Sequence, residues 1–112
     1  MKFALPIAIE ERYKTKEATR ENIRSCLNDA FVTVHDTFKT NVPSPEFSGT
    51  TCCTLLLKGR TIYSANAGDS RAIIITDKRK VTELTLDHKP ENPEEKKRIL
   101  EAGGRVHALT NH

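Results

Sequence analysis

One acidic residue lies in a short turn between two apolar stretches of the sequence, where it could bind a metal ion. Asp69 follows Gly68 and precedes Ser70, and the flanking stretches Ile62–Ala67 and Arg71–Ile75 have the composition of strands. Aspartate and serine satisfy backbone groups in tight turns, and glycine accepts a positive φ, so the turn could be purely structural. A carboxylate on a turn is also a suitable ligand for a hard divalent cation. These residues alone leave both interpretations open.

The segments around this turn predict a four-stranded antiparallel meander. β-branched and aromatic residues between turn signals indicate strands at Thr51–Leu57, Thr61–Ala67, Arg71–Thr76 and Val81–Leu86. The residues Lys58-Gly59-Arg60 and Asp77-Lys78-Arg79-Lys80 supply two of the turns. Two strands contain unbroken apolar runs, which suit strands that are covered on both faces: Leu55–Leu57 and Ile73–Ile75.

Helical patterns flank the predicted strands. A helix is expected from about Lys16 to Thr40, because apolar residues recur there at three- and four-residue steps: Ile23, Cys26, Leu27, Ala30, Phe31, Val34 and Phe38. A second, short helix should begin after Asn92, with Pro93 at its first position and Glu95 completing a capping box. Gly103-Gly104 provides its stop, and Arg105–Leu109 could begin another strand. The pattern as a whole predicts an α+β fold.

The composition is that of one soluble domain. The chain has 112 residues, 37% hydrophobic and 29% charged, with a net charge of +3, and its basic residues are mixed with acids, so we expect no nucleic-acid partner. Its three cysteines, two of them adjacent, form no C-x-x-C pair and are interpreted as small hydrophobic residues in a reducing compartment. The apolar run Phe3–Ile9 is too short for a membrane span and lacks the pattern of a signal peptide. An intracellular protein, cytoplasmic or nuclear, is expected.

Four motifs in order resemble a known family. They are Ser-Gly-Thr-Thr at residues 48–51, Asn-Ala-Gly-Asp-Ser-Arg at 66–71, Asp-His-Lys-Pro at 87–90, and a helix with Glu95 and Arg98-Ile99 that ends in Gly-Gly-Arg-Val at 103–106. This series is similar to the central part of the metal-dependent serine/threonine protein phosphatases of type 2C, the PPM family. The resemblance covers most of residues 1–112, which would form a partial domain of this type.

The resemblance implies a fold, a reaction and a set of site residues. The fold would be part of a four-layer α-β-β-α sandwich, with antiparallel sheets flanked by helices. The reaction would be hydrolysis of phosphoserine and phosphothreonine in a phosphoprotein substrate, by water activated between Mg²⁺ or Mn²⁺ ions. Asp69 would be a metal ligand at the cleft, and its turn and the nearby scaffold would comprise Ser48, Gly49, Thr50, Gly68, Ser70 and Arg71.

Most of the family's metal ligands have no counterpart in these 112 residues. They belong to an Asp-Gly-His-Gly-Gly motif expected before the first helix and to Asp-Gly and Asp-Asn motifs expected after residue 112, and none of these motifs occurs in the sequence. We therefore expect this chain to lack phosphatase activity when it is tested alone. The alternative is a catalytically inactive, phosphatase-like binding or regulatory module. A segment of a larger domain should also expose apolar strand faces, through which it could self-associate.

Other polar residues have weaker claims to a site. Asp87 and His88 with Glu91 could form a ligand group, but a turn that leads into the capped helix is the favoured interpretation. Arg71 and Arg105 could bind phosphate or could be ordinary surface residues. The remaining candidates are expected to contact only solvent or to lack partners: Asp29, Asp36, His107 and His112.

Overall fold

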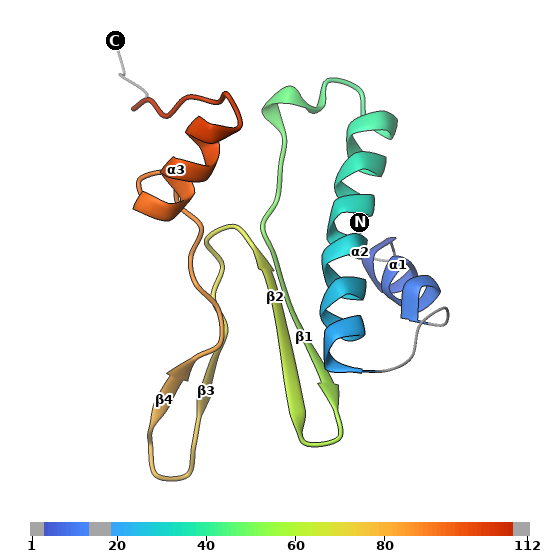
Figure 1. The fold of residues 1–112 in the computed structure, drawn as a ribbon, viewed down its shortest axis with the longest axis vertical. Helices are drawn as coiled ribbons and strands as arrows, with labels where there is room; N and C mark the ends of the chain where they lie inside the picture. Colours follow the sequence, from blue (N-terminus) through green and yellow to red (C-terminus); the bar gives the residue numbers. More distant parts are fainter. Residues whose placement is uncertain (1–3, 14–18, 109–112) are drawn as a thin grey trace.

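The computed structural model describes residues 4–13 and 19–108 as helices on one side and two β-hairpins with a further helix on the other (Figure 1). The radius of gyration is 16.6 Å, compared with about 13 Å for a compact domain of this length. The elements in chain order are α1 (Ala4–Tyr13), α2 (Arg20–Asn41), the 3₁₀ turn η1 (Pro45–Phe47), β1 (Cys52–Lys58), β2 (Thr61–Ala67), β3 (Ile73–Ile75), β4 (Val81–Glu83) and α3 (Pro93–Glu101).

The core of the chain lies between α1 and α2. The predicted apolar stripe of α2 supplies the buried residues Ile23, Cys26, Leu27 and Ala30, whereas Phe31, Val34 and Phe38 are half-buried. Helix α2 begins one residue after Thr19, whose side chain accepts a hydrogen bond from the backbone N–H of Asn22 at 3.1 Å. The predicted start at Lys16 lies outside the described residues. The helix itself is confirmed.

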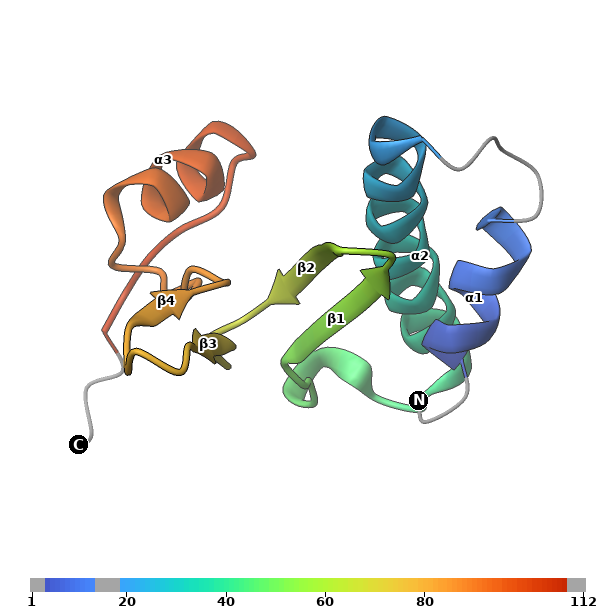
Figure 2. The ribbon, with the colours of Figure 1, turned by 90° about the horizontal axis from the view of Figure 1, so that it is seen from below.

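Helix α1 was not predicted from the sequence. It packs against α2 (Figure 2), and it buries Ala8. Cys26 donates a hydrogen bond from Sγ to the backbone carbonyl of Ile9 at 3.3 Å, and Arg12 donates to the hydroxyl of Thr33. Pro6 is compatible with this helix because it occupies the third position, where the backbone N–H has no intrahelical partner.

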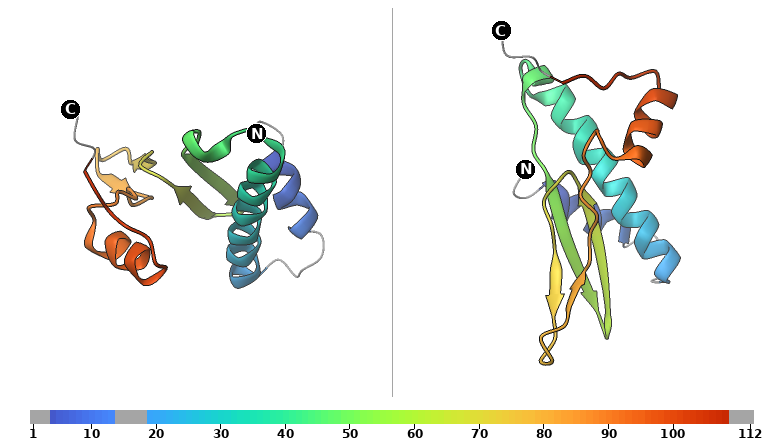
Figure 3. Two further views of the ribbon diagram at one scale, coloured as in Figure 1. Left: turned by 90° about the horizontal axis from the view of Figure 1, so that it is seen from above. Right: turned by 90° about the vertical axis from the view of Figure 1, so that its left-hand side faces the viewer.

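The strands form two separate hairpins, so the predicted four-stranded meander is wrong. Strand β1 pairs antiparallel with β2, from Cys52 opposite Ala67 to Lys58 opposite Thr61. Strand β3 pairs with β4 in a second sheet of two strands. The chain bends at Gly68 and Asp69 after β2, but β3 does not pair with β2 and continues into the second hairpin (Figure 3).

The second hairpin is also shorter than predicted. The expected strands Arg71–Thr76 and Val81–Leu86 are reduced to three residues each. The ladder becomes irregular at Ala72, which accepts a hydrogen bond from the backbone N–H of Leu84 at 2.9 Å and donates its own N–H to the Thr85 hydroxyl at 3.0 Å. Regular pairing therefore ends at Ala72, because its N–H bonds to a side-chain hydroxyl instead of the Leu84 carbonyl, which accepts from Ser64.

The apolar runs of the hairpins are largely exposed, and the expectation of cover on both faces is wrong for this chain. The relative exposure is 70% at Leu57 and 63% at Ile75. Leu57 and its partner Ile62 share one face of the hairpin, and the opposite face carries Lys58, whose ammonium lies 5.9 Å from the centre of the Tyr13 ring in α1. The exposed apolar strand faces agree with the expectation for a segment of a larger domain.

Helix α3 is confirmed, but its predicted capping box is not formed. Asn92 occupies the N-cap position, yet its side chain makes no capping hydrogen bond, and Glu95 pairs with Arg98 instead. The predicted glycine stop is present: Gly103 has a φ of +82°, and the N–H of Gly104 bonds to the carbonyl of Ile99 at 2.8 Å.

The remaining sequence expectations concern the C-terminal segment, the cysteines and membrane spans. Residues 105–108 of the expected strand are irregular, with no strand paired beside them among the described residues, and the rest of it lies outside the described range. The cysteines are free thiols: Cys26 is buried as expected, and Cys52 and Cys53 are half-buried. Over the described ranges, no helix is long and apolar enough to cross a lipid bilayer.

Candidate metal site at the Asp69 turn

Asp69 lies in an exposed turn immediately after β2, as the sequence indicates. The turn depends on Gly68 for two reasons. Its φ of +104° lies in a region that side chains disfavour, and a Cβ atom built on it would come within 2.5 Å of Thr51 Cγ2. Glycine is therefore required for both the backbone conformation and the close approach of the chain that enters β1.

The Ser-Gly-Thr-Thr motif contacts the turn through its last residue only. Ser48, Gly49 and Thr50 are exposed in the segment that leads into β1. Thr51 and Ser70 share a hydrogen bond of 2.7 Å between their hydroxyl oxygens. Sequence reasoning did not single out Thr51, although extending the β1–β2 register by one residue would have placed it opposite Gly68.

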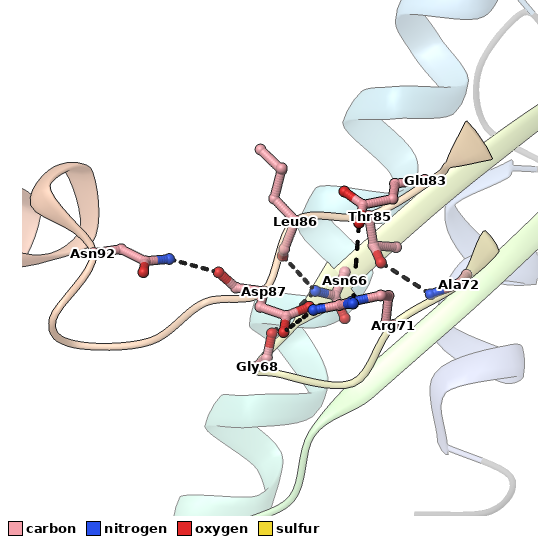
Figure 4. Close-up of polar contacts among 9 residues, drawn as sticks. All are labelled: Asn66, Gly68, Arg71, Ala72, Glu83, Thr85, Leu86, Asp87 and Asn92. Atoms are coloured by element: carbon pink, nitrogen blue, oxygen red, sulfur yellow. Dashed lines mark hydrogen bonds and ion pairs between the residues drawn. The ribbon is translucent and has the colours of Figure 1, made fainter. Parts of the chain in front are cut away.

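Arg71 is held by a carboxylate of the Asp-His-Lys-Pro motif. Its guanidinium donates two hydrogen bonds to Asp87, from Nε at 3.1 Å and from Nη2 at 2.8 Å, and Glu83 lies 4.0 Å from Nη1 (Figure 4). The hydrogen bond from Arg71 is the main cause that lowers the pKa of the Asp87 carboxyl, and the same contact raises the pKa of Arg71. This bidentate pair agrees with the interpretation of Asp87 as part of a turn and gives Arg71 a local partner in place of phosphate.

The backbone of Gly68 is bonded to His88 and to Asn66. The Gly68 carbonyl accepts hydrogen bonds from the backbone N–H of His88 at 2.9 Å and from Asn66 Nδ2 at 3.1 Å. The Gly68 N–H donates to His88 Nδ1 at 3.3 Å. Asn66 Nδ2 also donates to the carbonyl of Leu86 at 3.0 Å, as Figure 4 shows. Sequence reasoning missed the roles of Asn66 and His88, which depend on contacts twenty residues apart.

The turn can contribute one oxygen ligand, the Asp69 carboxylate, to a site for a hard cation. The exposed carboxylate of Asp69 is the kind of oxygen ligand that Mg²⁺ and Mn²⁺ prefer, and such ions retain several waters. Across residues 4–13 and 19–108, no group of three histidine, cysteine or acidic side chains lies close enough to hold a metal ion. Asp29 and Asp36 on α2 are exposed and far along the chain from the turn, His107 is exposed, and His112 lies outside the described residues.

Two hollows adjoin β2. One, of about 610 Å³, lies between α2 and β2, and its lining includes Arg24, Phe31 and Tyr63. The other, of about 450 Å³, is lined by residues of β2, of β4 and of the segment that follows β4: Ser64, Asn66, Glu83, Leu84, Thr85, Leu86 and His88. The side chains of Asn66 and His88, which bond to Gly68, thus also line the second hollow.

Comparison with known proteins identifies the family. The model of the protein phosphatase 2C family matches residues 2–111, which is nearly the whole chain. The chain belongs to the protein phosphatase 2C family. The resemblance of the four motifs is thereby confirmed, and the α+β class agrees with a partial fold of this family.

Individual relatives carry the same family name. The chain is 35% identical over 83 residues to rice probable protein phosphatase 2C 21, an alignment that covers 74% of this chain and 24% of the relative. It is 30% identical over 110 residues to protein phosphatase 2C 1 of Paramecium tetraurelia, covering 88% and 36%. A probable protein phosphatase of Drosophila melanogaster is 52% identical over 59 residues, which are 53% of this chain and 9% of the relative.

The matched region is a minor part of these phosphatases. The chain aligns with between 9% and 36% of the length of the three relatives. No solved structure matches the chain significantly.

Proposed function

We propose that the protein containing this chain is a metal-dependent protein phosphatase that hydrolyses phosphoserine and phosphothreonine in phosphoprotein substrates. The family match over residues 2–111 is the observation that carries this proposal. It is supported by the Asp69 turn, where Gly68 fixes the backbone and leaves one carboxylate exposed after a strand.

Asp69 is the residue of this chain that would hold the metal, either Mg²⁺ or Mn²⁺. When bound, such ions generate a nucleophilic water near neutral pH and neutralise charge on the phosphoryl oxygens. The chain's own contribution is to present one carboxylate on a turn bonded to Thr51, Asp87 and His88 through its other residues. Because the backbone on both sides of Asp69 is held, the main chain has little freedom to lose when the carboxylate binds the ion.

The 112 residues by themselves are proposed to be inactive. A binuclear site needs several ligands, and the described residues contain no group of three histidine, cysteine or acidic side chains that could hold a metal ion. The test compares phosphopeptide hydrolysis with Mn²⁺ by this chain and by the longest natural reading frame that contains it. We expect turnover by the longer protein alone, and its loss on Asp69→Asn. Turnover by the 112-residue chain would contradict the inactivity, and no turnover by either protein would contradict the phosphatase function.

The second candidate is an inactive, phosphatase-like binding module, in which the exposed apolar residues contact a partner. Leu57, Ile75 and Leu86 are each more than 60% exposed, and exposed apolar surface commonly marks an interface. A segment of a larger domain would expose the same residues but would self-associate through them. Sedimentation velocity over a concentration series, with urea denaturation, decides between the two: a stable monomer that unfolds cooperatively supports the module, and self-association contradicts it.

A further inference from the structure

The segment after β4 runs parallel to the end of β2 and is joined to it by evenly spaced hydrogen bonds. Ser64 Oγ donates to the carbonyl of Leu84 at 2.6 Å, and Asn66 Nδ2 donates to that of Leu86 at 3.0 Å. The third contact joins Gly68 and His88. The members of each pair are 20 positions apart in sequence, so both segments advance in the same direction in steps of two residues. We call this set of three contacts the seam.

The seam ends at the peptide group that precedes Asp69. The Gly68 carbonyl and the Asp69 N–H belong to one planar unit, so fixing the oxygen fixes the direction in which the backbone of Asp69 leaves the turn. Two donors fix that oxygen, namely Asn66 Nδ2 and the backbone N–H of His88. Because the Asp69 side chain itself is exposed, its position depends on this backbone anchor.

Asn66 is the only side chain in the seam that bonds both to the turn and to the neighbouring segment, among the residues that the structure describes. Its Nδ2 donates twice, but its Oδ1 is buried without a hydrogen-bond partner in the described part of the chain. A buried acceptor without a partner lowers stability, and an apolar residue of similar shape would avoid that loss. The asparagine at this position is therefore accounted for by the two bonds from Nδ2 and not by its Oδ1.

We propose that Asn66 is a positioning residue for the metal ligand Asp69, acting through the Gly68 carbonyl. This proposal rests on the metal role of Asp69 in the proposed function. Mg²⁺ requires near-ideal octahedral geometry, so a ligand held loosely binds it poorly. Groups that hydrogen-bond directly to a metal ligand typically contribute 10- to 100-fold to metal affinity, and we expect the lower end for Asn66, which acts through the neighbouring peptide group. His88 assists by bonding to both the N–H and the carbonyl of Gly68.

The test is a Mn²⁺ titration of the ¹⁵N-labelled 112-residue chain, followed by paramagnetic broadening of the amide signals, which detects weak binding without turnover. In the wild-type chain, signals of residues 67–71 should broaden first, and Asp69→Asn should abolish this preference. Asn66→Leu removes both donated bonds and the buried acceptor, and should raise the Mn²⁺ concentration required by about tenfold. Ser64→Ala is the matched control, because it removes a bond of the same seam two residues further from the turn, and it should leave the titration unchanged.

Two further experiments, hydrogen exchange and a pair of His88 variants, test the anchor separately from the metal site. Hydrogen exchange of the His88 N–H, which donates to the Gly68 carbonyl, reports the anchor without metal, and should accelerate in Asn66→Leu but not in Ser64→Ala. His88→Ala should weaken Mn²⁺ binding, and His88→Asn should restore it, because an asparagine oxygen can replace Nδ1 as the acceptor. This pair also provides the test if Asn66→Leu does not fold.

Each outcome decides one claim. Equal broadening in the wild-type chain and in Asp69→Asn would overturn the metal role of Asp69, and exchange of the His88 N–H would then still report on the anchor. Localised broadening in the wild-type chain that is unchanged in a folded Asn66→Leu variant would overturn the positioning role alone. Equal exchange of the His88 N–H in the wild-type chain and in folded Asn66→Leu would also overturn that role.

Discussion

The two parts of this molecule are held together by different forces. The helical part, α1 with α2, buries apolar residues such as Ile23 and Leu27 and contains nearly all of the buried residues of the described chain. The hairpin part, from β1 to α3, has one buried residue, Thr85, and is organised by hydrogen bonds and ion pairs of the motif residues. The difference indicates that the motifs of this family segment encode directional contacts around a turn, whereas stability comes mainly from the helices.

The largest effect is expected from breaking the helical part. Ile23 is 1% exposed, so Ile23→Ala leaves a cavity and should lower the free energy of unfolding by about 2–4 kcal/mol. Urea denaturation followed by circular dichroism measures this loss. The exposed Val32 of the same helix provides the control, since Val32→Ala removes little buried surface. Equal losses in the two variants would mean that Ile23 is not buried in solution.

The next largest effect is expected at the turn. Gly68→Ala places a Cβ atom 2.5 Å from Thr51 Cγ2 at a positive φ, and should cost roughly 2 kcal/mol in the free energy of unfolding. Gly49→Ala is the control, because an added Cβ there meets nothing within 4 Å. Combining Gly68→Ala with Thr51→Ser removes the clashing methyl group, so part of the loss should return. If Gly68→Ala is as stable as Gly49→Ala, the close approach described here is wrong.

A smaller, pH-dependent effect on stability is expected in the hairpin part, at the pair formed by Arg71 and Asp87. Arg71 lowers the pKa of Asp87 below its ordinary value of 3.8, so the folded chain binds this proton less readily than the unfolded chain does. The pair therefore stabilises the fold fully above about pH 4, and this contribution is lost as the pH falls through the folded-state pKa. Unfolding measured against pH should show the loss in the wild-type chain and a reduced loss in Asp87→Asn.

The Glu95–Arg98 pair provides a comparison for that experiment. The hydrogen bond from Arg98 also lowers the pKa of Glu95, so the acid sensitivity that remains in Asp87→Asn should fall further when Glu95→Gln is added. High salt should reduce both contributions, because the pairs are partly exposed. Identical pH profiles for the wild-type chain and Asp87→Asn would show that the bidentate pair does not form in solution.

The smallest effect on stability is expected at the exposed strand face. Leu57 is 70% exposed, so Leu57→Thr should change the free energy of unfolding by less than about 0.5 kcal/mol. The same substitution should reduce self-association if apolar strand faces drive it, which sedimentation velocity would show. A loss as large as that of Ile23→Ala would instead reveal that Leu57 is covered in solution.

Local patterns predicted the elements whose signals are contained in a single segment. The stripe of α2, the glycine stop of α3 and the pairing of β1 with β2 around Gly59 all follow from residues within a few positions of each other. The position of the candidate ligand Asp69 after a strand was predicted for the same reason. Helix α1 was missed because Pro6 and its short apolar run were considered only as a targeting signal.

Contacts between distant segments could not be read from these patterns. The Asn92 side chain would cap α3 in isolation, but it donates to the carbonyl of Asp87 instead. The meander failed because the segment beside β2 is the one after β4, bonded through the Ser64 and Asn66 side chains, whereas the prediction placed β3 there. The hydrophobic pattern of a strand does not show which distant segment lies beside it.

The seam should also influence how the sequence can drift in evolution. Its donors at positions 64 and 66 are side chains, while its acceptors at positions 84 and 86 are main-chain carbonyls that every amino acid possesses. Substitutions at Leu84 and Leu86 can therefore accumulate without breaking a bond of the seam, whereas most substitutions at Asn66 break one bond of the seam and the bond to the Gly68 carbonyl. We therefore expect position 66 to vary less among related proteins than positions 84 and 86 do.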